Sequence, residues 1–123
     1  MSSKIKSPFI GTGVAIVTPF KTDGSIDFPS LTKVINHIIK GQCEYIVVMG
    51  TTGESPTLSK QEKHDVLAHA IEIIKDRVPV VYGIGGFNTA EVVNQLITTD
   101  LLGVSGILSV VPYYNKPNQR GIY

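Results

Sequence analysis

Short unbroken runs of apolar residues alternate along this chain with stretches in which apolar residues recur every three or four positions. The runs cover residues 13–19, 45–49, 78–83 and 106–111, and they have the length and β-branched content of buried strands. The stretches between them have the period of amphipathic helices. The resulting repeat of about 30 residues is the size of a parallel βαβ unit. We therefore expect an α/β protein with a parallel sheet and right-handed crossovers.

Capping residues mark where the first two helices begin and end. Asp27 is expected to cap the first helix, with Pro29 in its first turn, and Gly41 is expected to end it. Ser59 and Glu62 form a capping box at the start of the second helix. The inward faces of these two helices are predicted to hold Leu31, Val34, Ile35, Ile38, Ile39, Val66, Leu67, Ala70, Ile73 and Ile74.

The third helix has a similar predicted start at Asn88 and Glu91, and Gly103 is expected to close it. Its predicted inward residues are Val92, Val93, Leu96 and Ile97. Each of the three helices therefore has one apolar face that can pack on the sheet.

Two architectures fit this alternation: a doubly wound sheet and a (β/α)8 barrel. A barrel needs eight strands and about 250 residues, whereas this chain of 123 residues holds four strand-like runs and stops at Tyr123. We expect residues 1–123 to form a single unit, the N-terminal half of a (β/α)8 (TIM) barrel. In both architectures the functional loops lie at the carboxyl ends of the strands.

The second apolar run ends in the loop Gly50-Thr51-Thr52-Gly53. Glycines lack a Cβ, so the backbone can turn sharply here and approach a ligand closely. Two hydroxyls and a run of backbone N–H groups suit a small anion such as a carboxylate. The alternative is a turn in which both threonines only satisfy the local backbone.

The fourth run leads into Pro112-Tyr113-Tyr114-Asn115-Lys116-Pro117. Adjacent residues at the end of a strand point in opposite directions, so one phenol can face a site while the other packs elsewhere. A phenol beside a threonine hydroxyl can pass a proton along a hydrogen-bonded chain. The alternative is that these aromatic residues only pack against a neighbouring loop.

Composition and charge exclude several classes of partner. The net charge of +1 gives no reason to expect nucleic acid or an anionic membrane. The single cysteine, Cys43, excludes an internal disulfide, is expected to be buried and fits a reducing compartment. No apolar run approaches the roughly 20 residues that span a bilayer, and Met1–Phe9 lacks the apolar core of a signal peptide. We therefore expect a cytoplasmic protein.

Other motifs indicate neither a metal site nor a cofactor site. The glycine loop Gly83–Gly86 lacks the G-x-G-x-x-G register, so tight turning is its expected role. His64 and His69 are five residues apart and do not share a helix face; with His37, they are expected to be solvated. Ser55 has no G-x-S-x-G around it, which argues against a nucleophile elbow.

Three segments together resemble one enzyme family. They are Gly50-Thr51-Thr52-Gly53-Glu54-Ser55, Pro112-Tyr113-Tyr114-Asn115 and the opening Gly13-Val14-Ala15-Ile16-Val17-Thr18-Pro19-Phe20. The chain is similar over nearly its whole length to the dihydrodipicolinate synthase (4-hydroxy-tetrahydrodipicolinate synthase) family. The threonine pair alone also fits relatives such as N-acetylneuraminate lyase and keto-deoxy sugar acid aldolases, and the tyrosine pair followed by Asn115 favours the synthases.

The resemblance implies a tetrameric (β/α)8 barrel, without a cofactor, in the pathway to lysine and diaminopimelate. Such an enzyme condenses pyruvate with L-aspartate 4-semialdehyde to 4-hydroxy-tetrahydrodipicolinate. Pyruvate forms a Schiff base with a lysine, becomes an enamine and attacks the aldehyde. Thr51 and Thr52, with Gly50, match the positions that hold the pyruvate carboxylate. Thr51 also matches a member of the proton relay, Tyr114 matches the relay tyrosine that reaches into the adjacent subunit, and Tyr113 matches an interface tyrosine.

The resemblance also implies that the Schiff-base lysine, a second relay tyrosine and a substrate-binding arginine lie beyond Tyr123. Lys116 is the only lysine near the expected site, and its polar loop offers neither the burial nor the neighbouring cation that a reactive amine needs. A non-catalytic half-barrel that oligomerises or binds small carboxylates is therefore the alternative of another class.

Some members of the family are inhibited by lysine, which binds at a subunit interface beside the position of Tyr113. Lys60 and Lys63 add positive charge at the matching surface, and Phe87 stands where a polar amide would hold the ligand. We therefore expect weak or absent feedback by lysine. The positions that match this interface are Ser55, Lys60, Lys63, Phe87, Glu91 and Tyr113.

Overall fold

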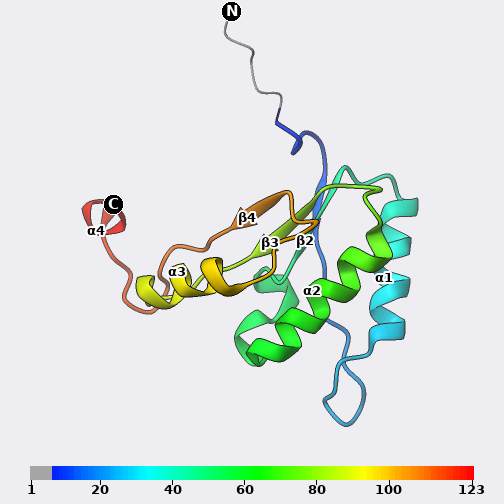
Figure 1. The fold of residues 1–123 in the computed structure, drawn as a ribbon, viewed down its shortest axis with the longest axis horizontal. Helices are drawn as coiled ribbons and strands as arrows, with labels where there is room; N and C mark the ends of the chain where they lie inside the picture. Colours follow the sequence, from blue (N-terminus) through cyan, green and yellow to red (C-terminus); the bar gives the residue numbers. More distant parts are fainter. Residues whose placement is uncertain (1–6) are drawn as a thin grey trace, which may run out of the picture.

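The computed structural model describes residues 7–123, in which four strands alternate with four α-helices (Figure 1). None of the helices in this part of the chain is long and apolar enough to cross a membrane. Two short 3-10 turns, Thr51–Gly53 and Ser55–Thr57, follow the second strand. The regular elements in chain order are β1 (Gly13–Ala15), α1 (Phe28–Lys40), β2 (Tyr45–Val48), α2 (Lys60–Ile74), β3 (Val80–Gly83), α3 (Thr89–Thr98), β4 (Gly106–Leu108) and α4 (Gln119–Ile122).

The four strands form one parallel sheet in the order β1-β2-β3-β4. A doubly wound sheet reverses its strand order next to the first strand, whereas a barrel adds strands in chain order. The observed order is therefore that of a (β/α)8 barrel, and the chain supplies its first four βα units. All three loops singled out in the sequence leave the carboxyl ends of strands, so they lie at the same edge of the sheet.

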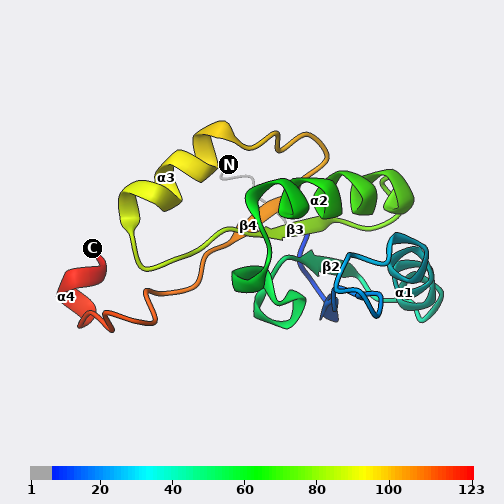
Figure 2. The ribbon, with the colours of Figure 1, turned by 90° about the horizontal axis from the view of Figure 1, so that it is seen from below.

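The core lies between the sheet and the pair of helices α1 and α2, which run side by side (Figures 1 and 2). The predicted caps are confirmed: Asp27 Oδ1 accepts a hydrogen bond from Ser30 N at 3.0 Å, and Ser59 and Glu62 form a complete capping box. These local bonds orient the apolar helix faces toward the sheet. The fully buried side chains include Leu31, Ile35, Ile46, Val48, Val66, Leu67 and Ile74.

The outer strands are shorter than the apolar runs predicted. β1 ends at Ala15 rather than Pro19, and both Gly13 and Ala15 are exposed. β4 ends at Leu108, and the exposed fractions of Val110 and Val111 are 45% and 53%. The expected buried strand at residues 13–19 is therefore wrong in both length and burial, and the strand expected at residues 106–111 ends three residues early. Each of these strands has only one hydrogen-bonded neighbour among the described residues. β4 ends opposite Gly83, the last residue of β3, so its ladder stops where that neighbour stops.

The third helix also differs from the prediction. α3 ends at Thr98 with Thr99 as its cap, and Gly103 instead occupies a separate turn with φ +84°. Val92 and Leu96 pack against the core, but Val93 and Ile97 are exposed. The apolar period identified the helix correctly, yet it could not show that only half of the apolar side chains contact the sheet.

Candidate functional site

A cavity of about 300 Å³ opens at the carboxyl ends of β2, β3 and β4. It is polar at a few points and otherwise apolar, which is the usual character of a small-molecule site. Of the residues that the sequence singled out, it brings together Gly50, Thr51, Ser55, Lys63 and Tyr113. Thr52, Tyr114, Lys60, Phe87 and Glu91 lie outside its lining. The remaining lining residues, none of which the sequence analysis assigned to this site, are Met49, Pro56, Gly83, Gly85, Leu108 and Val110.

The threonine pair forms the first turn of a short 3-10 helix. Gly53 N donates to Gly50 O, and Glu54 N donates to Thr51 O, each at 3.0 Å. In this pattern the first N–H groups of the turn have no partner within it. The N–H groups of Thr51 and Thr52 therefore remain available to an anion, together with the exposed hydroxyls of both residues.

Residues other than glycine make the sharp bends around this turn. Met49 and Glu54 have φ values of 59° and 56°, whereas Gly50 has a φ of −70°. The expected role of the two loop glycines as the bending residues is therefore wrong. Met49 is buried with 2% of its surface exposed, and a long apolar residue in the left-handed region is strained. No sequence signal marks this bend, because methionine is not a residue that favours it.

Gly83 and Gly85 are required because backbone segments come close together here. A Cβ at Gly83 would collide with the carbonyl oxygen of Met49, and one at Gly85 would lie 2.9 Å from Val110 N. Neither has a positive φ, so close approach rather than tight turning explains this loop. The two glycines let the ends of β2, β3 and β4 converge around the cavity.

We expect Gly83→Ala to destabilise the protein, because the added methyl group would have to push the β2 end away from β3. Overpacking of this kind costs about 1–3 kcal/mol, which a urea melt measures as a lower midpoint. Gly86→Ala is the matched control, since a Cβ there would only touch Val92 Cγ2 at 3.5 Å. Equal midpoints for the two variants would contradict the close-approach explanation.

The two tyrosines lie in a turn after β4 and do not point in opposite directions as predicted. Both contact the ring of Phe87: its centroid lies 5.6 Å from that of Tyr113 and 5.7 Å from that of Tyr114. Asn115 Nδ2 donates to Phe87 O at 3.3 Å. Tyr113 lines the cavity, whereas Tyr114 is 79% exposed and extends beyond it.

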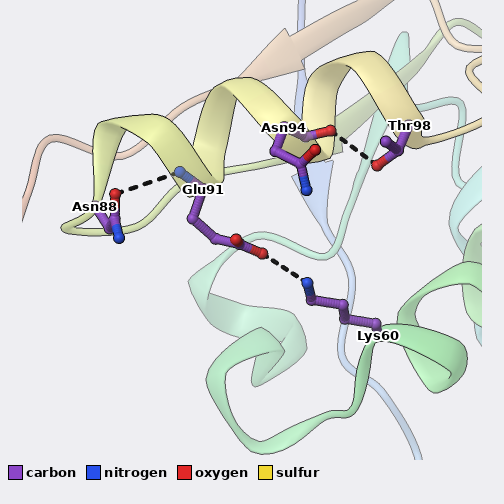
Figure 3. Close-up of polar contacts among 5 residues, drawn as sticks. All are labelled: Lys60, Asn88, Glu91, Asn94 and Thr98. Carbon is purple, nitrogen blue, oxygen red and sulfur yellow. Dashed lines mark hydrogen bonds and ion pairs between the residues drawn. The ribbon is translucent and has the colours of Figure 1, made fainter.

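An ion pair joins the first turns of α2 and α3 (Figure 3). Lys60 Nζ donates to Glu91 Oε1 at 2.7 Å, and this hydrogen bond holds the pKa of Glu91 below its usual value. Asn88 Oδ1 caps α3 by accepting from Glu91 N at 3.3 Å, and Thr98 Oγ1 bonds Asn94 O near the other end of the helix. The second predicted capping box is therefore only half formed, because the Glu91 carboxylate turns toward Lys60.

The remaining candidates have structural roles or lie in solvent. His69 is half-buried, with Nε2 2.8 Å from Thr32 Oγ1 and its ring against Phe28, so its predicted solvation is wrong. His37 and His64 are exposed, as predicted. Cys43 is buried as expected, and this burial raises the pKa of its thiol. Lys116 is exposed and does not line the cavity, whereas Lys63 does, so the prediction that Lys116 is the only lysine near the site is wrong.

Comparison with known proteins places this geometry in one family. The model of the dihydrodipicolinate synthetase family matches residues 8–123. The chain is 55% identical over 115 residues to the 4-hydroxy-tetrahydrodipicolinate synthase of Flavobacterium psychrophilum, and 50% identical over 115 residues to that of Cytophaga hutchinsonii. In both comparisons the match covers 94% of this chain and 39% of the relative. The chain thus spans about two fifths of the length of these curated relatives.

Solved structures give the same result. A crystal structure of dihydrodipicolinate synthase from Aquifex aeolicus matches with a TM-score of 0.83 and 42% identity, over 91% of this chain and 38% of that one. A monomeric dihydrodipicolinate synthase variant matches with a TM-score of 0.87 and 37% identity, over 94% and 38% of the two chains. Because the family model runs from residue 8 to residue 123, through every strand of the sheet, the chain belongs to the dihydrodipicolinate synthetase family.

Proposed function

We propose that this chain is the first part of a 4-hydroxy-tetrahydrodipicolinate synthase of lysine and diaminopimelate biosynthesis. Such an enzyme joins pyruvate to L-aspartate 4-semialdehyde through a Schiff base and an enamine. The proposal is supported by family membership and by relatives named as this synthase. For this chain itself, the observation that supports the proposal most directly is that Thr51 lines the cavity at the ends of β2, β3 and β4.

The 3-10 turn at Thr51–Gly53 offers pyruvate two kinds of hydrogen-bond donor, backbone N–H groups and threonine hydroxyls. The free N–H groups and hydroxyls of Thr51 and Thr52 can hold its carboxylate, with Gly50 leaving room beside them. A Cβ at Gly50 would have only ordinary contacts, 3.6 Å from Val47 and 3.9 Å from Leu108, so the glycine keeps the cavity open rather than relieving a clash. Hydrogen bonds to a charged group are stronger than neutral ones, so this turn both binds and orients the substrate.

The hydroxyl of Thr51 would also carry a proton during the reaction. It lies in the same cavity as Tyr113, and Tyr114 follows directly along the chain. A threonine hydroxyl can accept a proton from one partner while it donates its own to another, which is what a relay with tyrosines requires. The amine that forms the Schiff base would come from a lysine outside these 123 residues: Lys116 is exposed and away from the cavity, and Lys63, which does line it, belongs to helix α2 and not to the end of a strand.

Activity tests require the complete barrel, a protein of full family length in which this chain forms the first part. The direct test is consumption of pyruvate with L-aspartate 4-semialdehyde as the acceptor. We expect turnover with this aldehyde and none with an amino-sugar aldehyde, the acceptor of the N-acetylneuraminate lyase type. The reverse preference would contradict the proposal, as would an absence of turnover with both acceptors.

We further propose that the complete barrel associates through the surface that carries Tyr113 and Tyr114, as a homotetramer in the cytoplasm. Tyr114 is 79% exposed in the single chain and can therefore reach a second copy. The buried free thiol of Cys43 suits a reducing compartment. Tyr114→Ala should slow turnover and shift sedimentation toward smaller species. A single species of monomer mass in the unmodified barrel would contradict this assembly.

We also propose that lysine inhibits this enzyme weakly or not at all. The only carboxylate among the matching interface residues is that of Glu91, and the Lys60 ammonium already binds it at 2.7 Å. Lys63 adds a second positive charge in the lining of the neighbouring cavity. A cationic inhibitor would have to displace one ammonium group and approach another.

We expect the complete barrel to keep nearly full turnover in millimolar lysine. Replacing both cations, as Lys60→Gln with Lys63→Gln, should make inhibition by lysine stronger, because it frees Glu91 and removes the repulsion. Lys116→Gln is the matched control, since this lysine is exposed and outside the cavity. Strong inhibition of the unmodified enzyme would show that the ion pair does not block the site.

A further inference from the structure

Phe87 is the point where the loop after β3 meets the loop after β4. Its ring contacts two tyrosine rings at once: edge to face with Tyr113, at 5.6 Å and 86°, and tilted against Tyr114, at 5.7 Å and 51°. These are separations at which aromatic rings attract one another. The two loops lie side by side at the end of the molecule that also carries the start of α3 (Figures 1 and 2).

The backbone of Phe87 is held from both directions. Asn115 Nδ2 donates to its carbonyl oxygen at 3.3 Å, which ties it to the residue directly after the tyrosine pair. Asn88, the next residue in the chain, caps α3 and so fixes the position of the loop against that helix. The Lys60–Glu91 pair then joins the first turn of α3 to α2 (Figure 3). The backbone that carries the Phe87 ring is therefore fixed by hydrogen bonds to the neighbouring loop and to the start of α3.

The ring is in a place where it can act on the tyrosines without touching the substrate. It is 49% exposed and does not contribute to the lining of the cavity. Tyr113 is 47% exposed and Tyr114 is 79% exposed. Without the Phe87 ring, these phenols would lose an aromatic neighbour that restricts where they point, in a turn that has left the sheet.

We propose that Phe87 is a positioning residue: it fixes Tyr113 and Tyr114 in the arrangement that proton transfer needs, while taking no part in binding pyruvate. This inference rests on the proposed synthase function, in which Thr51 and Tyr114 belong to the proton relay and Tyr113 is the interface tyrosine next to Tyr114. Proton transfer depends steeply on distance, and a misplacement of about 1 Å can cost about 10²-fold in rate. Binding of pyruvate depends on the Gly50–Thr52 turn instead, and Phe87 is not among the residues that line the cavity beside that turn.

The test compares three variants of the complete barrel. Phe87→Ala removes the ring, and Phe87→Tyr keeps a ring of the same shape. Val93→Ala removes a half-exposed apolar side chain from α3, the helix that begins just after Phe87, and serves as the control. We expect Phe87→Ala to lower kcat by about ten- to 100-fold while the KM for pyruvate stays within about twofold of the unmodified value. Phe87→Tyr should recover most of the lost kcat, and Val93→Ala should leave it unchanged.

An unchanged kcat in Phe87→Ala, an equal loss in Phe87→Tyr, or a rise in the KM for pyruvate that explains the whole effect would each overturn the proposal. A second readout does not depend on activity: fluorine NMR of protein labelled with 3-fluorotyrosine. Phe87→Ala should shift two of the tyrosine signals, those of Tyr113 and Tyr114, and Phe87→Tyr should restore them. If the unmodified barrel has no synthase activity, the proposed function fails; unshifted tyrosine signals would overturn the positioning role in either case.

Discussion

Thr51→Val in the complete barrel is expected to lower kcat by about 10²–10⁴-fold, the usual contribution of a positioned acid–base group. Valine keeps the β-branch and approximate shape of threonine and replaces the hydroxyl with a methyl group. Thr51 is exposed at the cavity and not buried in the core, so the free energy of unfolding should change by no more than about 0.5 kcal/mol. A large loss of turnover with unchanged stability would show that the hydroxyl acts in the reaction.

Thr57→Val is the matched control for this change. Thr57 is exposed in the next 3-10 turn, where its hydroxyl donates to Glu54 O at 2.9 Å, and it does not line the cavity. We expect it to keep the turnover of the unmodified enzyme. If Thr51→Val kept it as well, Thr51 would have no part in the proton relay.

The second large effect concerns the 123-residue chain by itself, which we expect to have no synthase activity although it carries Thr51 and Thr52. Without an amine at a strand end of the cavity, which Lys63 on α2 does not supply, pyruvate can bind but cannot become an enamine, so no carbon nucleophile forms. Orientation by the threonines cannot replace this step, because it accelerates a reaction only between groups that are present. The measurement is turnover at the same molar concentration as a complete barrel.

The isolated chain is also expected to associate. Leu108, Val110 and Val111 are each about half exposed along β4 and the segment after it, and the outer edge of this strand has no neighbour among residues 7–123. Size-exclusion chromatography should therefore show species larger than one chain. Measurable synthase turnover in any of these fractions would contradict the need for a lysine outside the chain.

The sequence predicted those features that depend on residues close together in the chain. Asp27 and Ser59 cap their helices because a cap needs only a partner three residues away. The parallel sheet followed from the alternation of apolar runs and apolar periods. The same periodicity failed at Val93 and Ile97, because an apolar side chain on a helix says nothing about whether another element covers it.

The parts of the site that could not be predicted depend on contacts between distant segments. Lys60 and Glu91 are 31 residues apart, and Phe87 and Asn115 are 28 apart, so no local pattern connects them. Gly83 was expected only to allow a tight turn, because its actual constraint, the nearby carbonyl of Met49, becomes visible only when β2 and β3 lie side by side. The resemblance to a family identified Thr51, Tyr113 and Tyr114 as a group, whereas spacing alone left each of them with a structural alternative.

The most direct measurement is to trap the Schiff base. The complete barrel is incubated with pyruvate and borohydride, which reduces the imine to a stable amine, and the modified lysine is then found by peptide mass spectrometry. We expect one pyruvate-derived adduct, on a lysine outside these 123 residues, and none on Lys116. An adduct on Lys116 or on another lysine of this chain, or no adduct at all, would contradict the proposed chemistry.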